Sequence, residues 1–149
     1  MKALLQRVNK AKVTVENQVV GEIGRGLLLF LGIHRADEAA KIPWLVEKVT
    51  NLRIFEDQEG KMNLSVRDVM GEILVVSQFT LYGNCQTGRR PSFTEAMPPQ
   101  EAERLYELFI QEFKKAVGEK HVATGQFGAY MQVELVNDGP VTLMLSHQG

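Results

Sequence analysis

Two short segments of the sequence carry side chains that could do chemistry. The first, Ser77-Gln78-Phe79-Thr80, follows directly on the apolar run Ile73-Leu74-Val75-Val76. Such a run is typical of a buried strand, and its end is a common position for working side chains. The segment has no nucleophile-elbow pattern around Ser77, and no histidine is placed by the sequence to activate a hydroxyl. These residues alone favour a strand end that meets solvent over a catalytic nucleophile.

The second segment is Asn137-Asp138-Gly139-Pro140, which lies between two apolar stretches. Asn, Asp and Gly are the preferred turn residues, and proline can open a strand when its nitrogen is not needed as a donor. Taken alone, the tetrapeptide predicts a hairpin between strands at about 131–136 and 141–145. The local sequence leaves the isomer of the Gly139-Pro140 bond open.

Neither a metal site nor a cofactor site is indicated. The three histidines are far apart and show no ligand spacing, and the one cysteine, Cys85, has no partner nearby. The glycines at 21–26 match neither nucleotide-binding fingerprint, and no helix is expected after them. We therefore expect no metal and no cofactor.

Residues 83–99 contain three prolines, two glycines and two adjacent arginines. Such a long irregular segment in a compact domain is usually functional or disordered. Arg89-Arg90 is a candidate phosphate-binding pair, because guanidinium groups match phosphate oxygens. From the sequence alone, a solvated loop tip or an ion pair with a nearby glutamate is favoured.

Apolar periodicity predicts the elements that must position these segments. Alternation predicts a hairpin of strands at 4–16 and 19–23, uniformly apolar runs predict buried strands at 27–31 and 73–76, and a short strand is expected at 52–55. A helix is expected from the N-cap Asp37 to about Asn51, although Pro43 favours a start nearer Lys41. The clearest helix runs from Pro99 to Val117.

Together these elements predict an α+β fold, with two main helices packed on a largely antiparallel, barrel-like sheet. We expect one domain spanning residues 1–149. The 17 basic and 18 acidic residues nearly cancel, so a nucleic-acid partner would be held through few phosphates. One cysteine and the lack of a long apolar stretch or a secretory signal predict a soluble, cytoplasmic protein.

In combination, the segments resemble the D-aminoacyl-tRNA deacylase family. Ser77-Gln78-Phe79-Thr80-Leu81 and Asn137-Asp138-Gly139-Pro140-Val141-Thr142 match its two motifs. The other matching blocks, in chain order, are Gln6-Arg7-Val8, Asn51-Leu52-Arg53-Ile54-Phe55, Gly60-Lys61-Met62-Asn63, Gly88-Arg89-Arg90-Pro91-Ser92-Phe93 and Thr124-Gly125-Gln126-Phe127-Gly128-Ala129. Blocks over nearly the whole chain make chance agreement implausible. Tyr130 departs from the pattern, because many members carry an acidic residue there.

The resemblance implies an enzyme that hydrolyses the ester joining a D-amino acid to the terminal adenosine of tRNA. It also implies a homodimer with its active site at the subunit interface. In the family, a cis Gly-Pro bond reaches into the partner subunit's pocket. Carried onto this chain, Gly139-Pro140, with Asn137 beside it, would exclude L side chains with backbone atoms. Glycine has no side chain to exclude, so the family also removes glycine mischarged onto alanine tRNA.

The family's chemistry would account for the missing catalytic triad. The resemblance implies that the 2′-hydroxyl of the terminal adenosine takes part, while backbone N–H groups near Phe79 and Thr80 stabilise the oxyanion. The side chains of Gln78 and Thr80, in the same motif as Ser77, would position the substrate. Phe127 and Met131 would line the adenosine or amino-acid pocket.

Two other interpretations stay open from the sequence. In one, Thr80 is a covalent nucleophile toward D-amides or peptides. In the other, the chain is a non-catalytic module that binds the tRNA end. The first predicts that Thr80→Ala abolishes turnover, and the second predicts stable binding of D-aminoacyl-tRNA with no release of amino acid.

Overall fold

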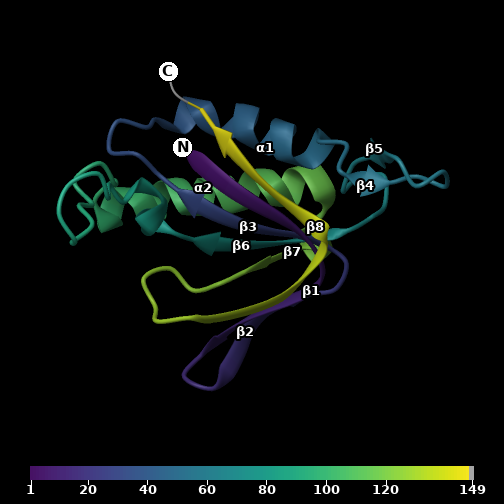
Figure 1. Ribbon diagram of the computed structural model, residues 1–149, viewed down its shortest axis with the longest axis horizontal. Coiled ribbons are helices and arrows are strands. Elements are labelled where there is room, and N and C mark those ends of the chain that lie inside the picture. Colours follow the sequence, from purple (N-terminus) through teal and green to yellow (C-terminus); the bar gives the residue numbers. More distant parts are fainter. Residues whose placement is uncertain (148–149) are drawn as a thin grey trace.

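The computed structural model describes residues 1–147. The helices are α1 (Ile42–Asn51) and α2 (Pro99–Val117), and the 3₁₀ turns are η1 (Ala39–Lys41), η2 (Phe79–Tyr82) and η3 (Glu119–His121). The strands are β1 (Lys2–Val15), β2 (Gln18–Ile23), β3 (Gly26–Gly32), β4 (Phe55–Glu56), β5 (Met62–Leu64), β6 (Glu72–Ser77), β7 (Val122–Thr124) and β8 (Gln132–Ser146). The two helices lie on one side of a strongly curved sheet (Figure 1). No helix in the described part of the chain is long and apolar enough to cross a membrane.

The long strand β1 organises the sheet by pairing with three others. Residues 2–8 of β1 pair with β3 and residues 11–15 pair with β2, while β8 runs antiparallel along its other edge. The order is β2-β1-β3-β6-β7, with β8 attached to β1. Because β1 serves two sets of neighbours, the sheet curls into a nearly closed, barrel-like form (Figure 1). The predicted α+β class with a barrel-like sheet and two main helices is confirmed.

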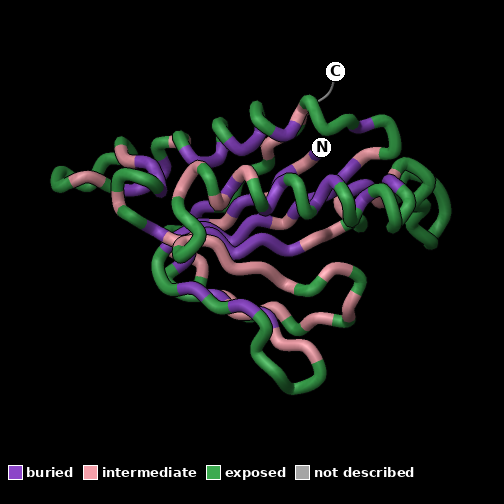
Figure 2. Tube along the Cα trace, turned by 180° about the vertical axis from the view of Figure 1, so that it is seen from behind, coloured by how far each residue is buried: buried purple, intermediate pink, exposed green. Residues whose placement is uncertain are grey.

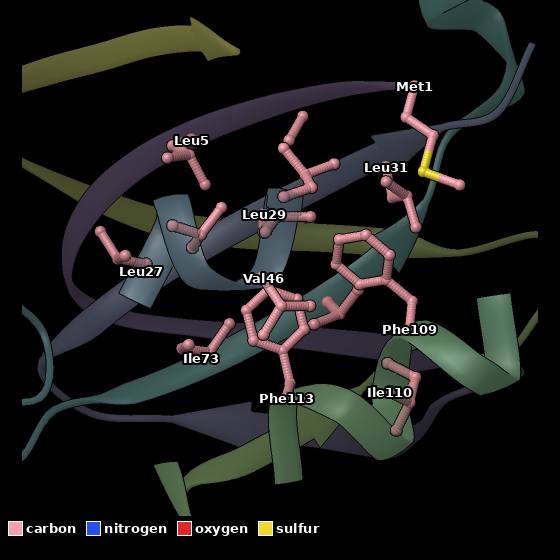
Figure 3. Close-up of a cluster of buried hydrophobic side chains, with 14 of the residues drawn as sticks. Met1, Leu5, Leu27, Leu29, Leu31, Val46, Ile73, Phe109, Ile110 and Phe113 are labelled. Carbon is pink, nitrogen blue, oxygen red and sulfur yellow. The ribbon is translucent and has the colours of Figure 1, made fainter. Parts of the chain in front are cut away.

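The two uniformly apolar runs became the parallel pair β3–β6, and β7 extends the parallel part of the sheet. Alternate side chains of these strands enter two separate cores, which explains why every position is apolar. Leu27, Leu29 and Ile73 face the helices, where Figure 3 shows them gathered with Phe109 and Phe113. Leu28 and Leu74 face the inside of the barrel. In Figure 2, most of the buried residues, drawn in purple, lie along these central strands.

The predicted hairpin around Asn137-Asp138-Gly139-Pro140 is wrong. Residues 132–146 form one strand, β8, which pairs with β1 on both sides of the tetrapeptide. The register shifts between Gln6 and Val8 of β1, opposite the Gly-Pro pair. Proline lacks a backbone donor and is tolerated in a strand at such an irregularity, so turn-forming residues kink the strand without reversing it.

Two local predictions also need correction. Asp37 is not the N-cap of α1, because that helix begins at Ile42 with Pro43 in its first turn, as the proline indicated. The buried Asp37 carboxylate instead binds the Met1 amino group (N–Oδ2 2.7 Å), Lys41 Nζ (2.9 Å) and the His34 N–H (2.6 Å). Burial opposes its charge, but these donors outweigh burial and hold the pKa of the carboxyl below its ordinary value. The strand expected at 52–55 is shorter and later, at Phe55–Glu56.

Candidate functional site

A cleft of about 400 Å³ opens where the carboxyl ends of β3 and β6 meet. Side chains beyond the ends of neighbouring parallel strands converge, so this edge is a natural place for a ligand. The segment 83–98, the first turns of α2 and the loop between β7 and β8 form the other walls. The lining residues are Leu31, Ile33, Ser77, Gln78, Phe79, Phe93, Ala96, Met97, Pro98, Pro99, Ala102, Tyr106, Phe127 and Gly128.

The predicted Ser77-Gln78-Phe79-Thr80 segment carries two free backbone donors, one on Phe79 in the lining of this cleft and one on Thr80 at its rim. β6 ends at Ser77, the Gln78 N–H donates to the Leu31 carbonyl (2.8 Å), and the chain turns into η2. The N–H groups of Phe79 and Thr80 open this 3₁₀ turn and have no acceptor within residues 1–147. Paired backbone donors of this kind suit an oxyanion that develops at a carbonyl carbon.

Gly32 allows η2 to pack closely against the end of β3. A Cβ atom at Gly32 would lie 2.9 Å from Leu81 Cβ and 3.2 Å from the Gln78 carbonyl oxygen. Both distances are shorter than ordinary van der Waals contact, so any side chain at this position would displace η2. The position of the two backbone donors therefore depends on the absence of a side chain at residue 32.

Thr80 lies at the rim and does not line the cleft. Its exposed hydroxyl accepts a short hydrogen bond from Gln78 Nε2. No Asp, Glu, His, Lys or Arg side chain is among the residues that line the cleft, and neither histidine nor carboxylate is hydrogen-bonded to this hydroxyl in the described part of the chain. The geometry thus offers Thr80 no base for nucleophilic attack, and it gives Gln78 and Thr80 a shared, fixed orientation.

Aromatic rings make the cleft largely apolar. Phe79 packs edge-on against Phe93, with ring centroids 5.2 Å apart, and Tyr106 lies 5.6 Å from Phe127. The Tyr106 hydroxyl donates to the Val75 carbonyl (3.1 Å). Burial, and to a smaller extent the charge of Glu107, raises the pKa of this hydroxyl above its ordinary value. With its ring buried and its hydroxyl bonded to a backbone carbonyl, Tyr106 forms part of the wall of the cleft.

The two predicted pocket residues after β7 are in different places. Phe127 lines the cleft, in a loop whose Gly128 has a positive φ of 77°. Met131 instead packs beside the core inside the barrel, and its sulfur would lie 2.8 Å from a Cβ atom at Gly125. Met131 is not among the residues that line the cleft.

Gly139-Pro140 lies in an exposed kink of β8, and its peptide bond is cis. Arg7 holds the kink from below, although only 4% of this residue is exposed. Its Nε donates to the Asp138 carbonyl (3.2 Å) and lies 3.3 Å from the Asp138 carboxylate, while Nη1 donates to the Ile54 carbonyl (2.7 Å). Charge-assisted bonds from a buried guanidinium fix backbone geometry strongly.

Asn137 bridges the kink with its side chain. Its Oδ1 accepts the Val141 N–H (3.1 Å), and its Nδ2 donates to the Val141 carbonyl (3.2 Å) and to Thr142 Oγ1 (3.2 Å). These bonds replace backbone pairing where the strand is irregular. Asn137 therefore supports the shape of the Gly139-Pro140 backbone.

Gly139 has no room for a side chain. Its φ is 133°, and a Cβ atom would lie 2.9 Å from the Val141 nitrogen and 3.1 Å from Arg7 Nη2. At Gly139 the kink thus exposes backbone atoms with no side chain.

The Gly139-Pro140 kink is remote from the cleft of its own chain. Arg7, beneath the kink, pairs with Leu27 of β3, which pairs with Ile73 of β6. Ser77 stands four residues beyond Ile73, roughly 13 Å along the strand. Neither Gly139 nor Pro140 lines the cleft. The two predicted motifs therefore form two separate surfaces of one chain.

The sequence did not reveal several residues that shape these surfaces. Tyr106 lies on the apolar face of α2, and helical periodicity alone does not indicate that this face continues into a cleft. Phe93 was hidden in the irregular segment. Arg7 belongs to a matching block, but a lone arginine in an alternating strand normally predicts an exposed side chain.

Comparison with known proteins identifies the family. A family model described as D-Tyr-tRNA(Tyr) deacylase matches residues 4–146. The chain belongs to this family. It is 58% identical over 145 residues to a D-aminoacyl-tRNA deacylase of Thermotoga petrophila, with 97% of this chain and 96% of the relative covered. It is 56% identical over 149 residues to one of Heliobacterium modesticaldum, with coverage of 100% and 98%.

Two solved structures share the family fold. A c-Myc DNA unwinding element binding protein superposes with a TM-score of 0.95 at 44% identity, and each chain is covered completely. A probable eukaryotic D-amino acid tRNA deacylase superposes with a TM-score of 0.82 at 20% identity, with 97% of each chain covered. At that identity the second similarity concerns the fold alone.

Proposed function

We propose that this chain is a D-aminoacyl-tRNA deacylase, which hydrolyses the ester of D-aminoacyl-tRNA and releases free D-amino acid and tRNA. Membership of the D-Tyr-tRNA(Tyr) deacylase family over residues 4–146 carries the proposal. The proposed substrate is a cytoplasmic molecule, and we place the enzyme in the cytoplasm.

The chemistry we propose uses backbone donors and a hydroxyl of the substrate. The free N–H groups of Phe79 and Thr80 would stabilise the oxyanion formed when the ester carbonyl is attacked. No titratable side chain other than Tyr106 lines the cleft, which supports assistance by the 2′-hydroxyl of the terminal adenosine rather than by a protein base. Ser77, Gln78 and Phe127 would orient the substrate, with Thr80 fixing the Gln78 amide.

We further propose that Gly139-Pro140 rejects L-substrates from the cleft of a second copy of the chain. The kink is exposed, rigidly held by Arg7 and Asn137, and remote from its own cleft, so only another chain could bring it to a cleft. A homodimer is supported by the outer edge of β8, which pairs with no strand in residues 1–147 and carries exposed Val136, Leu143 and Met144.

A filter that excludes side chains would not exclude glycine. The enzyme is therefore proposed to hydrolyse glycine mischarged onto alanine tRNA as well as D-aminoacyl-tRNA. L-Alanyl-tRNA carries one additional methyl group on the excluded side and would be spared.

Hydrolysis of matched substrates tests the function. The purified chain should release tyrosine from D-tyrosyl-tRNA and leave L-tyrosyl-tRNA intact at equal concentrations. Stable binding of D-tyrosyl-tRNA without release of tyrosine would instead indicate a non-catalytic module that binds the tRNA end. Thr80→Ala should retain substantial activity, because its hydroxyl only positions Gln78, and complete loss with an intact fold would favour a covalent threonine.

A further inference from the structure

The loop Asn84–Ser92 carries two arginines whose charges have no partner in the described structure. Arg89 and Arg90 are exposed, and neither takes part in an ion pair or a side-chain hydrogen bond within residues 1–147. Gly88, just before them, has a positive φ of 69° and marks the turn of the loop. These facts fit a solvated loop tip, one of the two interpretations that the sequence favours for Arg89-Arg90, but they assign no role to the pair.

The base of the loop is fixed to the wall of the cleft. Asn84 and Ser92 exchange two backbone hydrogen bonds (2.7 and 2.9 Å), and the Asn84 side chain accepts the Gln86 N–H (2.9 Å). Phe93 follows at once, lines the cleft and packs on Phe79. Arg90 is three residues from Phe93, a span of at most roughly 11 Å. The two guanidinium groups are therefore tethered at the cleft mouth.

The N-terminal end of α2 lies at the same cleft mouth. Pro98 and Pro99, at the N-terminus of this 19-residue helix, line the cleft. The N-terminal end of a helix carries a partial positive charge that favours anions nearby. Two unpaired arginines and a helix N-terminus thus supply positive charge near the approach to an otherwise apolar cleft. The acidic residues nearby are Glu95 and Glu101, and Glu101 is paired with Arg104.

We propose that Arg89 and Arg90 bind the phosphates of the tRNA strand that precede the terminal nucleoside. This inference rests on the proposed function, in which the terminal adenosine and its ester occupy the cleft. The phosphate on the 5′ side of that adenosine then lies at the mouth, within reach of the arginine charges. Figure 1 shows this segment at the end of the molecule opposite β4 and β5.

Two substrates separate this role from a structural one. D-Tyrosyl-tRNA has the phosphates, and the D-tyrosyl ester of adenosine lacks them. Two single-strand contacts change the logarithm of affinity by about 1.4 per tenfold change in salt, a factor of about 25 between 1 M and 0.1 M. Arg89→Ala/Arg90→Ala should therefore lower kcat/KM on the tRNA by up to about 25-fold at 0.1 M salt. Turnover of the adenosine ester should stay unchanged, and Arg89→Lys/Arg90→Lys should retain most of the activity on tRNA.

The control is Arg53→Ala/Arg67→Ala, which removes two exposed arginines outside the cleft lining and should change neither substrate. Equal losses on both substrates, or no loss on tRNA, would overturn the proposal. If the wild-type chain hydrolyses neither substrate, the proposed function fails, and binding of uncharged tRNA then tests the loop by itself. Weaker binding by the alanine pair supports the loop's role, whereas equal binding, or tighter wild-type binding to single-stranded DNA of equal length, overturns it.

Discussion

In the proposed filter, the backbone of Gly139 is itself the functional group. Any other L residue there would adopt a disfavoured φ of 133° and bring Cβ to 2.9 Å from the Val141 nitrogen. Gly139→Ala should therefore shift the exposed backbone, and a displaced filter admits L side chains. We expect discrimination between D- and L-tyrosyl-tRNA to fall by about tenfold or more, which corresponds to ~1.4 kcal/mol of lost selectivity. Parallel measurement of kcat/KM on both substrates provides the check.

Gly60→Ala is the matched control for this substitution. Gly60 also has a positive φ (77°), but nothing lies within 4 Å of its Cβ position, and it sits in the turn before β5. Alanine at this position also meets a positive φ, with no link to the filter. If Gly139→Ala slowed D-hydrolysis and left the D/L ratio unchanged, Gly139 would be a structural residue and the filter would lie elsewhere.

At the residue scale, the sequence predicts which residues belong to the candidate site better than it predicts where their side chains lie. Phe127 and Ser77 were assigned to the site and do line the cleft. The resemblance predicts Met131 in the same pocket, yet its side chain packs beside the core inside the barrel, just before β8 begins. A motif preserves the order of residues along the chain. The direction of each side chain depends on strand register, which a single sequence does not specify.

At the element scale, the joint between β3 and η2 controls the backbone donors. Gly32→Ala would press Cβ against Leu81 Cβ and the Gln78 carbonyl oxygen, and η2 would have to move with its Phe79 and Thr80 N–H groups. Misplacing oxyanion donors by a fraction of an ångström lowers kcat, here on the order of tenfold to a hundredfold, with a smaller change in KM. Single-turnover hydrolysis of D-tyrosyl-tRNA measures the effect.

Gly24→Ala serves as the control, because its Cβ would meet only Glu72 Oε1 at an ordinary 3.5 Å. It should retain wild-type kcat. Unchanged turnover in a folded Gly32→Ala variant would mean that η2 does not supply the catalytic donors. Thermal melts of both variants separate this outcome from a loss of folded protein.

Most elements were predictable because their apolar periods are strong. The buried strands β3 and β6 and the helix α2 appear at the expected residues. The one error of topology was at β8, where the residues of a turn lie within a strand. Local propensity favoured reversal of the chain, but pairing with β1 on both sides of the kink, together with the Arg7 and Asn137 hydrogen bonds, outweighed it.

At the scale of the whole molecule, the proposed site is complete only when two chains meet, and mixing two variants tests this arrangement. In Gly139→Ala the cleft is intact and the filter altered, whereas in Gly32→Ala the filter is intact and the cleft slowed. A mixed dimer would hold one site with an intact cleft and an intact filter. Co-refolding Gly139→Ala with a tenfold excess of Gly32→Ala should pair about nine in ten of its clefts with an intact filter, by random assortment.

Hydrolysis of L-tyrosyl-tRNA by the mixture should then fall to between about one tenth and one fifth of the value for the same amount of Gly139→Ala alone, by the same assortment. The slowed Gly32→Ala clefts that face an altered filter account for the upper end of this range. D-Tyrosyl-tRNA hydrolysis should persist. A filter acting within its own chain would not respond to the added partner, and L-hydrolysis would stay constant. The control is Gly139→Ala mixed with an excess of Gly24→Ala/Gly139→Ala. Because this second variant also carries an altered filter, the ratio of D- to L-tyrosyl-tRNA hydrolysis should not be restored. The remote position of the kink from the cleft in a single chain makes restoration the expected result.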